Sequence, residues 1–485
     1  TQIDKSTKKN KNIQFHYSQK SMVDDFGRVF FYNNKVFREI SNKNYCLELL
    51  NSDLFKELIG ENLIPQTSIT NEFSNNTDSL VLEHEKILES LQHEWSYQML
   101  KDAAVLVLKI NTICNKYGYE LKDAHTLNIL FKGCKPVFVD IGSISLKKEN
   151  TLWTAYSEFL NSFFFPLLFW SNNKHYIVRK LLESNFHRMF TIPFQSFEDS
   201  NLLSLINLNH HFYEFKVNKR IIFKTRKKHF FIDGFRKVFN FSLKKMLRIN
   251  NYFANYSKEK DLTKVFPYKK IQKTILDLIP PKANSLWAGY HSKFYNDFEK
   301  IIISDRFNRL LDIINKYDDI NSAIDLAGNE GYFSYLLSKK TKIDKIILAD
   351  YDENAIDKAF INFKQNKITS ITPLLLNFMF TPNMEDTAKR LKSDIALSLA
   401  VTHHLILTSG FSLSAILERL ASYSKKYVMV EFMPLGLWSI ENKKEQKLPD
   451  WYNVEWFRKE FSSKFELILE EQVEENRIVF LGKLK

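Results

Sequence analysis

The stretch Ser322-Ala-Ile-Asp-Leu-Ala-Gly-Asn-Glu-Gly-Tyr-Phe333 decides the fold of the C-terminal part of the chain. It contains an apolar run that ends on Asp325, a tight turn with Gly328 and Gly331, and the start of an amphipathic segment. This order predicts a strand, a glycine turn and a helix N-terminus. The backbone N–H groups of such a turn suit the binding of a nucleotide-type cofactor.

A second acidic residue follows at the spacing that adenosyl sites use. The next apolar run ends in Asp350, 25 positions after Asp325. A carboxylate about 20 residues past the glycine turn can accept hydrogen bonds from the ribose hydroxyls. Ala327 and Asn329 stand where glycine is common in dinucleotide sites, so the turn offers a pyrophosphate less room. We therefore expect S-adenosylmethionine, rather than NAD, at a site made by Asp325, Ala327, Gly328, Asn329, Gly331 and Asp350.

Three more apolar runs, at 371–377, 393–404 and 426–431, alternate with helix-like segments. This alternation predicts an α/β fold with a parallel sheet covered on both faces. Because ligands bind beyond the carboxyl ends of such strands, we expect Asn377, His403, His404 and Glu431 at the site. The histidines and Glu431 are candidate catalytic bases for a substrate hydroxyl or amine. The alternative is that one histidine packs or caps a helix and Glu431 makes a structural hydrogen bond.

Residues 285–485 resemble class I S-adenosylmethionine-dependent methyltransferases, and most closely a group named after a host-specific nodulation protein. The resemblance rests on the segments 286–290, 325–334, 349–352, 399–405, 430–434 and 448–457. It implies a Rossmann-like fold and adds Trp287, Tyr290, Tyr351, Asn377 and Phe378 to the residues expected at the cofactor. Many relatives have Asp next to the adenine where this chain has Asn377, and an amide can still form hydrogen bonds there.

The N-terminal part carries the spacing of a kinase catalytic loop. Asp123 and Asn128 fit D-x-x-x-x-N, and the apolar run after them ends in Asp140-Ile-Gly142. Phosphoryl transfer needs a carboxylate near the acceptor hydroxyl, and an Asn and an Asp that hold magnesium. Asp123 is therefore a candidate base, and Asn128 and Asp140 are candidate ligands of Mg²⁺ that would accompany ATP. The region resembles the α+β kinase-like fold of small-molecule and sugar kinases.

Three positions depart from the kinase pattern, and one of them is Lys122, where a kinase would have Arg. The loop that should cover the phosphates has only Gly27, and Arg38 stands where a kinase would offer a lysine. A kinase-like domain that binds a substrate or a partner without phosphoryl transfer is therefore an alternative. In a third, purely structural reading, Asp123 caps a turn and Asp140 makes local hydrogen bonds.

Length and composition limit the organisation of the chain. A chain of 485 residues favours two domains, which we place at 1–275 (kinase-like) and 276–485 (methyltransferase). Three scattered cysteines without a Cys-x-x-Cys pair disfavour a disulfide framework or a zinc site. The longest apolar run, 163–170, is far shorter than the roughly 20 residues of a membrane span. The first residues lack an apolar signal-peptide core, and we expect a cytoplasmic protein.

The positive charge is concentrated in one segment. Residues 214–273 contain 18 Lys or Arg and 4 Asp or Glu, which accounts for the net charge of +13 of the whole chain. Within it, 235–248 has apolar and basic residues on different faces of a helix. Such a helix can bind an anionic membrane, which would place the protein at the inner membrane, or an anionic glycan. It can equally be an ordinary helix with a solvated face, and no recognised nucleic-acid module accompanies it.

These patterns lead to three hypotheses about function. The first is a methyltransferase that uses S-adenosylmethionine, with an oxygen of a sugar or glycan precursor as the acceptor. That acceptor is implied by the family resemblance alone. The second is a bifunctional kinase–methyltransferase, and the third is a methyltransferase attached to a non-catalytic kinase-like binding module.

Overall fold

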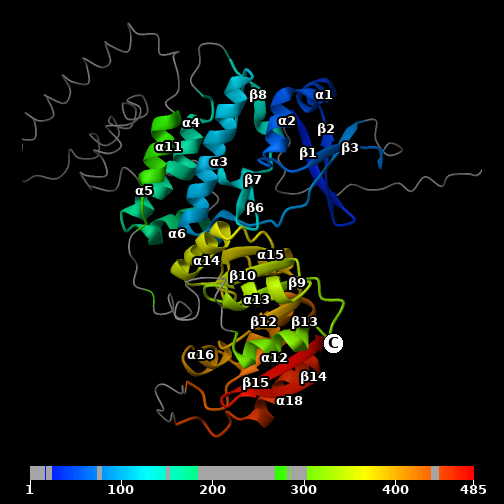
Figure 1. The fold of residues 1–485 in the computed structure, drawn as a ribbon, viewed down its shortest axis with the longest axis vertical. Helices are drawn as coiled ribbons and strands as arrows, with labels where there is room; N and C mark the ends of the chain where they lie inside the picture. The colour runs from blue at the N-terminus through cyan, green and yellow to red at the C-terminus, as the bar shows by residue number, and fades with distance from the viewer. Residues whose placement is uncertain are drawn as a thin grey trace, which may run out of the picture.

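The computed structural model describes residues 17, 25–73, 79–148, 153–183, 268–280, 285, 303–437 and 447–485. Two lobes are visible, with the N-terminal half above and the C-terminal half below (Figure 1). The basic segment 214–273 lies outside the described residues up to 267, and so do Trp287 and Tyr290. None of the helices in the described ranges is long and apolar enough to cross a membrane.

Seven strands form the C-terminal sheet, in the order β11-β10-β9-β12-β13-β15-β14. The five parallel strands are β9 (Ser322–Leu326), β10 (Lys345–Asp350), β11 (Ile371–Leu375), β12 (Ser393–Ser398) and β13 (Ser424–Phe432). An antiparallel hairpin, β14 (Phe465–Glu474) and β15 (Arg477–Leu484), completes the sheet beside β13. Because β9 lies between β10 and β12, the strand order reverses there, and ligands bind at such a reversal.

The helices of this half form two packed groups. In one group α12 (Asp305–Ile314) contacts α13 (Tyr332–Lys340), while α13 and α14 (Glu353–Gln365) both contact β10. In the other, α17 (Leu413–Ser422) contacts α15 (Met384–Leu391), α16 (Thr402–Leu407) and α18 (Val454–Lys464). The parallel strands are buried along nearly their whole length, as expected when both faces are covered. The strand order and the two helical layers confirm the predicted Rossmann-like class I methyltransferase fold.

One predicted strand is shorter than expected. The run 393–404 was expected to be a single strand, but β12 ends at Ser398 and α16 begins at Thr402. Ala400 turns the chain between them with a positive φ of 53°. His403 and His404 therefore lie on a short helix beyond the strand. Their rings do not point to opposite faces of the sheet, as neighbouring side chains on a strand would.

A four-stranded antiparallel sheet with the order β1-β2-β4-β3 opens the N-terminal half. Its strands are β1 (Gly27–Tyr32), β2 (Lys35–Ile40), β3 (Thr67–Thr70) and β4 (Leu80–His84). Asn33 and Asn34 have φ values of 45° and 64°, so they make the tight turn between β1 and β2. Two helices, α1 (Lys43–Asn51) and α2 (Asp53–Gly60), follow β2.

Helices dominate the rest of the N-terminal half. The long α3 (Tyr97–Lys116) contacts α2, α5 (Phe165–Ser171) and α11 (Tyr268–Asp277). The short hairpin of β6 (Ile129–Lys132) and β7 (Lys135–Phe138) follows α3, and β5 (Tyr119–Leu121) pairs with β8 (Ile144–Leu146). The remaining elements are η1 (Gln92–Glu94), η2 (Thr126–Asn128), η3 (Ile141–Ser143), α4 (Tyr156–Phe159), the π-helix η4 (Leu160–Phe164) and α6 (His175–Glu183). The N-terminal half is thus a small antiparallel sheet with a helix pair, followed by a helical lobe, and its kinase-like fold stays a prediction.

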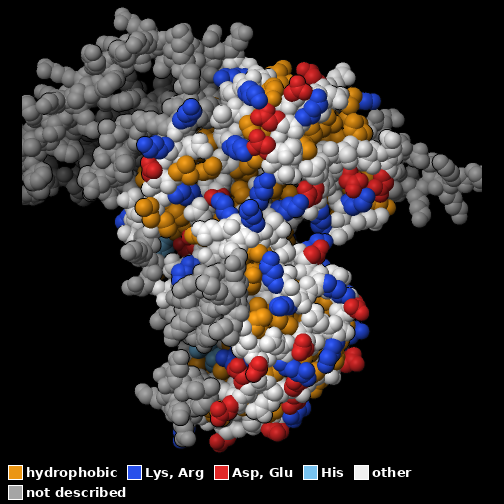
Figure 2. Space-filling model, viewed as in Figure 1, with side chains coloured by type: hydrophobic (Ala, Val, Ile, Leu, Met, Phe, Trp, Pro, Cys, Tyr) orange, Lys and Arg blue, Asp and Glu red, His pale blue; other side chains and the backbone are white. Residues whose placement is uncertain are grey.

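The two halves are in direct contact. α14 lies against the N-terminal half (Figure 1), where the Phe131 and Phe360 rings meet edge to face at 5.8 Å. The carboxylate of Glu94 and the guanidinium of Arg390, both buried, pair at 2.5 Å across the same junction. On the visible face, Lys and Arg side chains gather near the waist between the lobes (Figure 2).

Candidate active site

The glycine turn after β9 has the strained backbone that its sequence indicates. Ala327, Asn329 and Gly331 all have positive φ, at 60°, 53° and 77°. A Cβ on Gly328 would lie 2.7 Å from the Asp325 carboxylate, and one on Gly331 would lie 2.6 Å from the Leu348 side chain. These contacts explain why glycine occupies both positions. The turn therefore brings backbone directly over the carboxyl ends of β9 and β10.

Asp350 joins this turn to the end of β10. Its Oδ2 accepts from the backbone N–H of Asn329 at 2.8 Å, and its Oδ1 accepts from the N–H of Asp352 at 2.8 Å. Burial raises the pKa of Asp350 to about 6, although these backbone hydrogen bonds oppose the rise. Each carboxylate oxygen has a further lone pair, so Asp350 can still accept two hydrogen bonds.

Asp325 is fixed by a side chain that sequence reasoning did not single out. The Ser334 hydroxyl, on the first turn of α13, donates to Asp325 Oδ2 at 2.7 Å. Burial raises the pKa of Asp325 to about 6, and the Ser334 hydrogen bond opposes that rise. Both acidic residues at the predicted site therefore lie under the turn, with their oxygens held in fixed directions.

The other predicted cofactor residues in this half differ in exposure. Asn377 follows β11 and is exposed, and its Oδ1 accepts from the N–H groups of Met379 and Phe380 at 3.1 and 3.2 Å. That arrangement leaves the amide NH₂ of Asn377 as its outward donor. Phe378 is buried, whereas Tyr351 is exposed at the end of β10. All three follow the carboxyl ends of β10 and β11.

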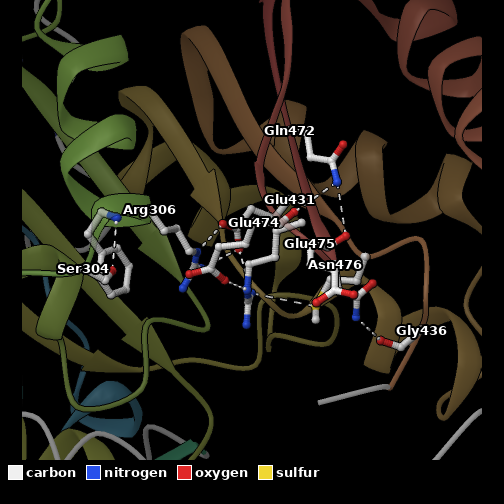
Figure 3. A network of polar contacts seen from close by, with 11 residues as sticks. Ser304, Arg306, Glu431, Gly436, Gln472, Glu474, Glu475 and Asn476 are labelled. Atoms are coloured by element: carbon white, nitrogen blue, oxygen red, sulfur yellow. Dashed lines mark hydrogen bonds and ion pairs between the residues drawn. The ribbon is translucent and has the colours of Figure 1, made fainter. Parts of the chain in front are cut away.

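Glu431 lies in a buried network of charges near the end of β13 (Figure 3). Its side chain is fully buried, and Arg306 from α12 donates to both of its oxygens, at 2.6 and 2.5 Å. Arg477 from β15 donates to Oε2 at 3.1 Å and also pairs with Glu474 at 2.8 Å. Burial raises the pKa of Glu431, but the two guanidinium groups outweigh burial and hold it below its usual value. A carboxylate so paired is a weak proton acceptor, and this geometry favours the structural alternative for Glu431.

The two histidine rings lie side by side on α16, with their centroids 4.1 Å apart. His403 is buried, and burial lowers its pKa to about 3, so its ring is neutral near pH 7. Its Nδ1 has no hydrogen-bond partner in the described part of the chain. His404 is more exposed, and burial lowers its pKa as well. Of these two neutral imidazoles, His404 is therefore the more accessible to a substrate.

Sequence reasoning did not find Arg306 or Arg477, and it left the C-terminal hairpin undescribed. Arg306 lies 125 residues before its partner Glu431, and Arg477 lies 46 residues after it. A single arginine gives no indication in the sequence that it will pair with a buried carboxylate. The sequence could have pointed to Arg306, the second residue of α12, as a partner of Glu431 only if the order of the strands had been known.

The three predicted kinase-like residues meet around Ser143. The Ser143 hydroxyl donates to Asp140 Oδ2 at 2.7 Å and lies 3.3 Å from Asp123 Oδ2. The side-chain amide of Asn128 donates to the same hydroxyl at 3.3 Å. The D-x-x-x-x-N and Asp-x-Gly patterns therefore do converge in space, as the kinase resemblance implies.

Asp140 is paired with Arg38 from β2. The Nη1 of Arg38 lies 2.9 Å from Asp140 Oδ1, which also accepts from the Gly142 N–H at 3.3 Å. Burial raises the pKa of Asp140, but Arg38 and then Ser143 hold it below its usual value. No cluster of three or more His, Cys, Asp or Glu side chains suited to a metal occurs among the described residues. The Arg38 guanidinium therefore neutralises the Asp140 carboxylate, and the magnesium role of Asn128 and Asp140 stays a prediction.

The strand order of the C-terminal half is that of the class I methyltransferase fold. The chain is similar to nodulation protein NoeA of Rhizobium meliloti (strain 1021), with 23% identity over 429 residues, which cover 85% of this chain and 84% of NoeA. This similarity confirms the resemblance to the nodulation-type group over most of the chain. No family model matches the chain.

Solved structures similar to this one include several methyltransferases. Magnesium protoporphyrin IX methyltransferase from Synechocystis PCC 6803, with bound SAM, is 12% identical; the match covers 37% of this chain and 78% of that one, with a TM-score of 0.29. WbdD is 19% identical; the match covers 39% of this chain and 43% of WbdD, with a TM-score of 0.28. WbdD is described as a bifunctional kinase-methyltransferase.

Proposed function

We propose that this protein is an S-adenosylmethionine-dependent methyltransferase that methylates an oxygen of a sugar or glycan precursor. The observation that carries the proposal is Asp350, whose two oxygens are oriented by the N–H groups of Asn329 and Asp352. The free lone pairs of that carboxylate suit the two ribose hydroxyls of an adenosyl group. The cofactor, when bound, supplies an electrophilic methyl group.

The residues around Asp350 fit the remaining parts of such a cofactor. The turn 327–331 would receive the amino-acid part over Asp325, because the backbone of Gly328 lies close to the Asp325 carboxylate. Asn377 would meet the adenine with its amide, and Tyr351 and Phe378 would flank the ring. Trp287 and Tyr290 remain predicted contacts outside the described residues. The turn has fewer glycines than a pyrophosphate site requires, which supports this cofactor over NAD.

His404 is the base in this proposal. It would take the proton of the acceptor hydroxyl, while the site holds that oxygen in line with the methyl group. Positioning would supply most of the rate enhancement, and proton removal typically contributes a factor of 10² to 10⁴. His403 would support the orientation of His404, since the two rings are in contact. Glu431 would hold α12 and β15 against β13.

The acceptor class rests on the resemblance to the nodulation-type group and on no described residue. Mass spectrometry of surface glycans, with and without the gene, tests it. We expect a glycan that is lighter by about 14 Da per lost methyl group when the protein is absent. Identical glycans in both samples would contradict a sugar acceptor. We further propose a cytoplasmic enzyme whose segment 214–273 contacts an anionic membrane or glycan.

Cofactor affinity should depend on pH because the two acidic residues titrate near pH 6. A protonated Asp350 accepts fewer hydroxyl hydrogen bonds, so the Kd for S-adenosylhomocysteine should rise up to about tenfold per pH unit below 6. The free energy of unfolding of the unliganded protein should change with pH in the opposite direction. A carboxyl pKa raised by folding makes the folded state bind protons more tightly, so the contribution of Asp325 and Asp350 to stability should increase as the pH falls from about 6 towards about 4.

Calorimetric titrations between pH 5 and 8, and urea unfolding between pH 4 and 8, test both halves of this prediction. Asp350→Asn is the matched control, since it removes one of the two titrating carboxyls and should flatten the affinity profile. An affinity that stays constant down to pH 5 would contradict the assigned role of Asp350.

For the N-terminal half we propose a binding module without phosphoryl transfer. The ion pair between Arg38 and Asp140 supports it over a bifunctional kinase. Thermal unfolding with ATP, with and without Mg²⁺, should show no magnesium-dependent stabilisation. A magnesium-dependent shift that Asp140→Asn removes would instead favour the bifunctional kinase–methyltransferase.

A further inference from the structure

The helix that follows the candidate ribose-binding residue is held by the other half of the protein. Glu353, in the first turn of α14, accepts hydrogen bonds from two N-terminal side chains. Trp170 Nε1 donates to Oε1 at 2.6 Å, and Arg179 Nε donates to Oε2 at 3.1 Å. Both carboxylate oxygens are thus fixed by groups that lie more than 170 residues earlier in the chain.

The donors themselves have little freedom. Arg179 Nη1 donates to the backbone carbonyls of His93 and Trp95, at 3.2 and 2.8 Å. The Arg179 guanidinium also lies over the Trp170 ring, 4.6 Å from its centre. Trp170 is almost fully buried. A guanidinium with this many partners loses little further freedom when it binds a carboxylate, so it can fix the position of Glu353.

Glu353 is connected to the adenosyl site through three residues of backbone. The N–H of Asp352 orients Asp350, and the Asp352 carboxylate caps α14 by accepting from Asn354 and Ala355 at 2.9 and 3.1 Å. Asp350 in turn holds the glycine turn through Asn329. A displacement of the first turn of α14 would therefore change the direction of the Asp350 oxygens and the shape of the glycine turn.

A second contact secures α14 one turn further along. Asp357 accepts from the backbone N–H of Gln98 at 2.7 Å, at the N-terminus of α3. That N–H is one of the groups that an α-helix leaves without an internal partner. The Asp357 carboxylate therefore caps the N-terminus of α3, and this contact joins the end of α3 to the side of α14.

We propose that the N-terminal half sets the affinity of the adenosyl site, with Arg179 and Trp170 acting through Glu353 as positioning residues for Asp350. This inference rests on the proposed cofactor. It gives the kinase-like half a role in methyl transfer that needs no chemistry of its own. A ligand that moved α6 or α5 would change cofactor affinity in the other half.

The test is the affinity of the full-length protein for S-adenosylhomocysteine, measured by calorimetry. Glu353→Gln keeps the shape of the side chain and removes its charge, and we expect the Kd to rise about tenfold, within the range of known couplings between sites. Lys364→Met is the matched control. It breaks the ion pair with Asp102 at the opposite end of α14 and should change the Kd less than twofold.

A double variant separates positioning from general destabilisation. In an Asp350→Asn background, adding Glu353→Gln should cause no further loss, because the residue through which Glu353 acts has already been changed. Trp170→Phe, which removes one donor but keeps a ring, should raise the Kd about threefold if Glu353→Gln does not fold. Wild-type affinity in both single variants, or additive losses in the double variant, would overturn the inference. If the wild type binds no S-adenosylhomocysteine, the proposed function fails first, and the inference fails with it.

Discussion

Asp350→Ala should raise the Kd for S-adenosylhomocysteine at least a hundredfold, which is the largest effect on binding that the structure predicts. Hydrogen bonds to a charged group contribute roughly 1.5–3 kcal/mol each, and this carboxylate would accept two from the ribose. Its removal also frees the N–H of Asn329, which Asp350 now holds at 2.8 Å. The glycine turn would lose its fixed shape in addition to the direct contacts.

Asp344→Ala is the matched control for this variant. Asp344 is exposed and lies just before β10, at the end of the strand opposite Asp350. Asp344 carries the same charge as Asp350, so Asp344→Ala changes the net charge by the same amount and leaves the candidate site intact. Calorimetric titration of both variants should give a large loss for Asp350→Ala and wild-type affinity for Asp344→Ala. Equal affinities in the two variants would refute the assignment of Asp350.

Glu431→Ala should be the most destabilising single substitution among the candidate site residues. Glu431 is fully buried and neutralises the guanidinium groups of Arg306 and Arg477, which are mostly buried. Removing one member of a buried ion pair typically costs about 3–5 kcal/mol, because an uncompensated charge remains in the interior. We expect a lower urea midpoint for Glu431→Ala, while Asp318→Ala, which breaks an exposed pair with Lys342, should unfold like the wild type.

A second substitution of Glu431, to Gln, distinguishes a structural role of this residue from a catalytic one. If Glu431 were the base, Glu431→Gln would lower kcat by a factor of 10² to 10⁴. With His404 as the base, that loss should instead follow His404→Ala, and the folded fraction of Glu431→Gln should retain turnover within a few-fold. Methyl transfer by Glu431→Gln at under one-hundredth of the wild-type rate, with native unfolding behaviour, would restore Glu431 as the catalytic residue.

The parts of this structure that depend on local patterns were predictable. The glycine turn could be recognised because Gly328 and Gly331 are required by contacts with Asp325, Leu348 and Phe363, which belong to the same β-α-β-α unit. The five parallel strands follow from apolar runs, since a strand buried on both faces must be continuously apolar. Asp325 and Asp350 could be found because each ends such a run.

The parts that depend on distant pairing could not be predicted. Arg306 gives no sign in the sequence that it meets Glu431, and nothing near Glu353 indicates Trp170 or Arg179. The end of β12 was also misplaced, because apolar residues continue past Ser398 and the turn at Ala400 has no glycine or proline to signal it. Each miss concerns an interaction that exists only once the helices and strands have packed.

The central claim, that Asp325, Asp350 and the glycine turn form an adenosyl-cofactor site, is tested most directly by calorimetric titration of the full-length protein with S-adenosylhomocysteine. The account predicts one molecule bound per chain in the micromolar range or tighter, with no comparable binding of NADH. A folded protein that binds NADH but not S-adenosylhomocysteine, or that binds neither, would contradict it.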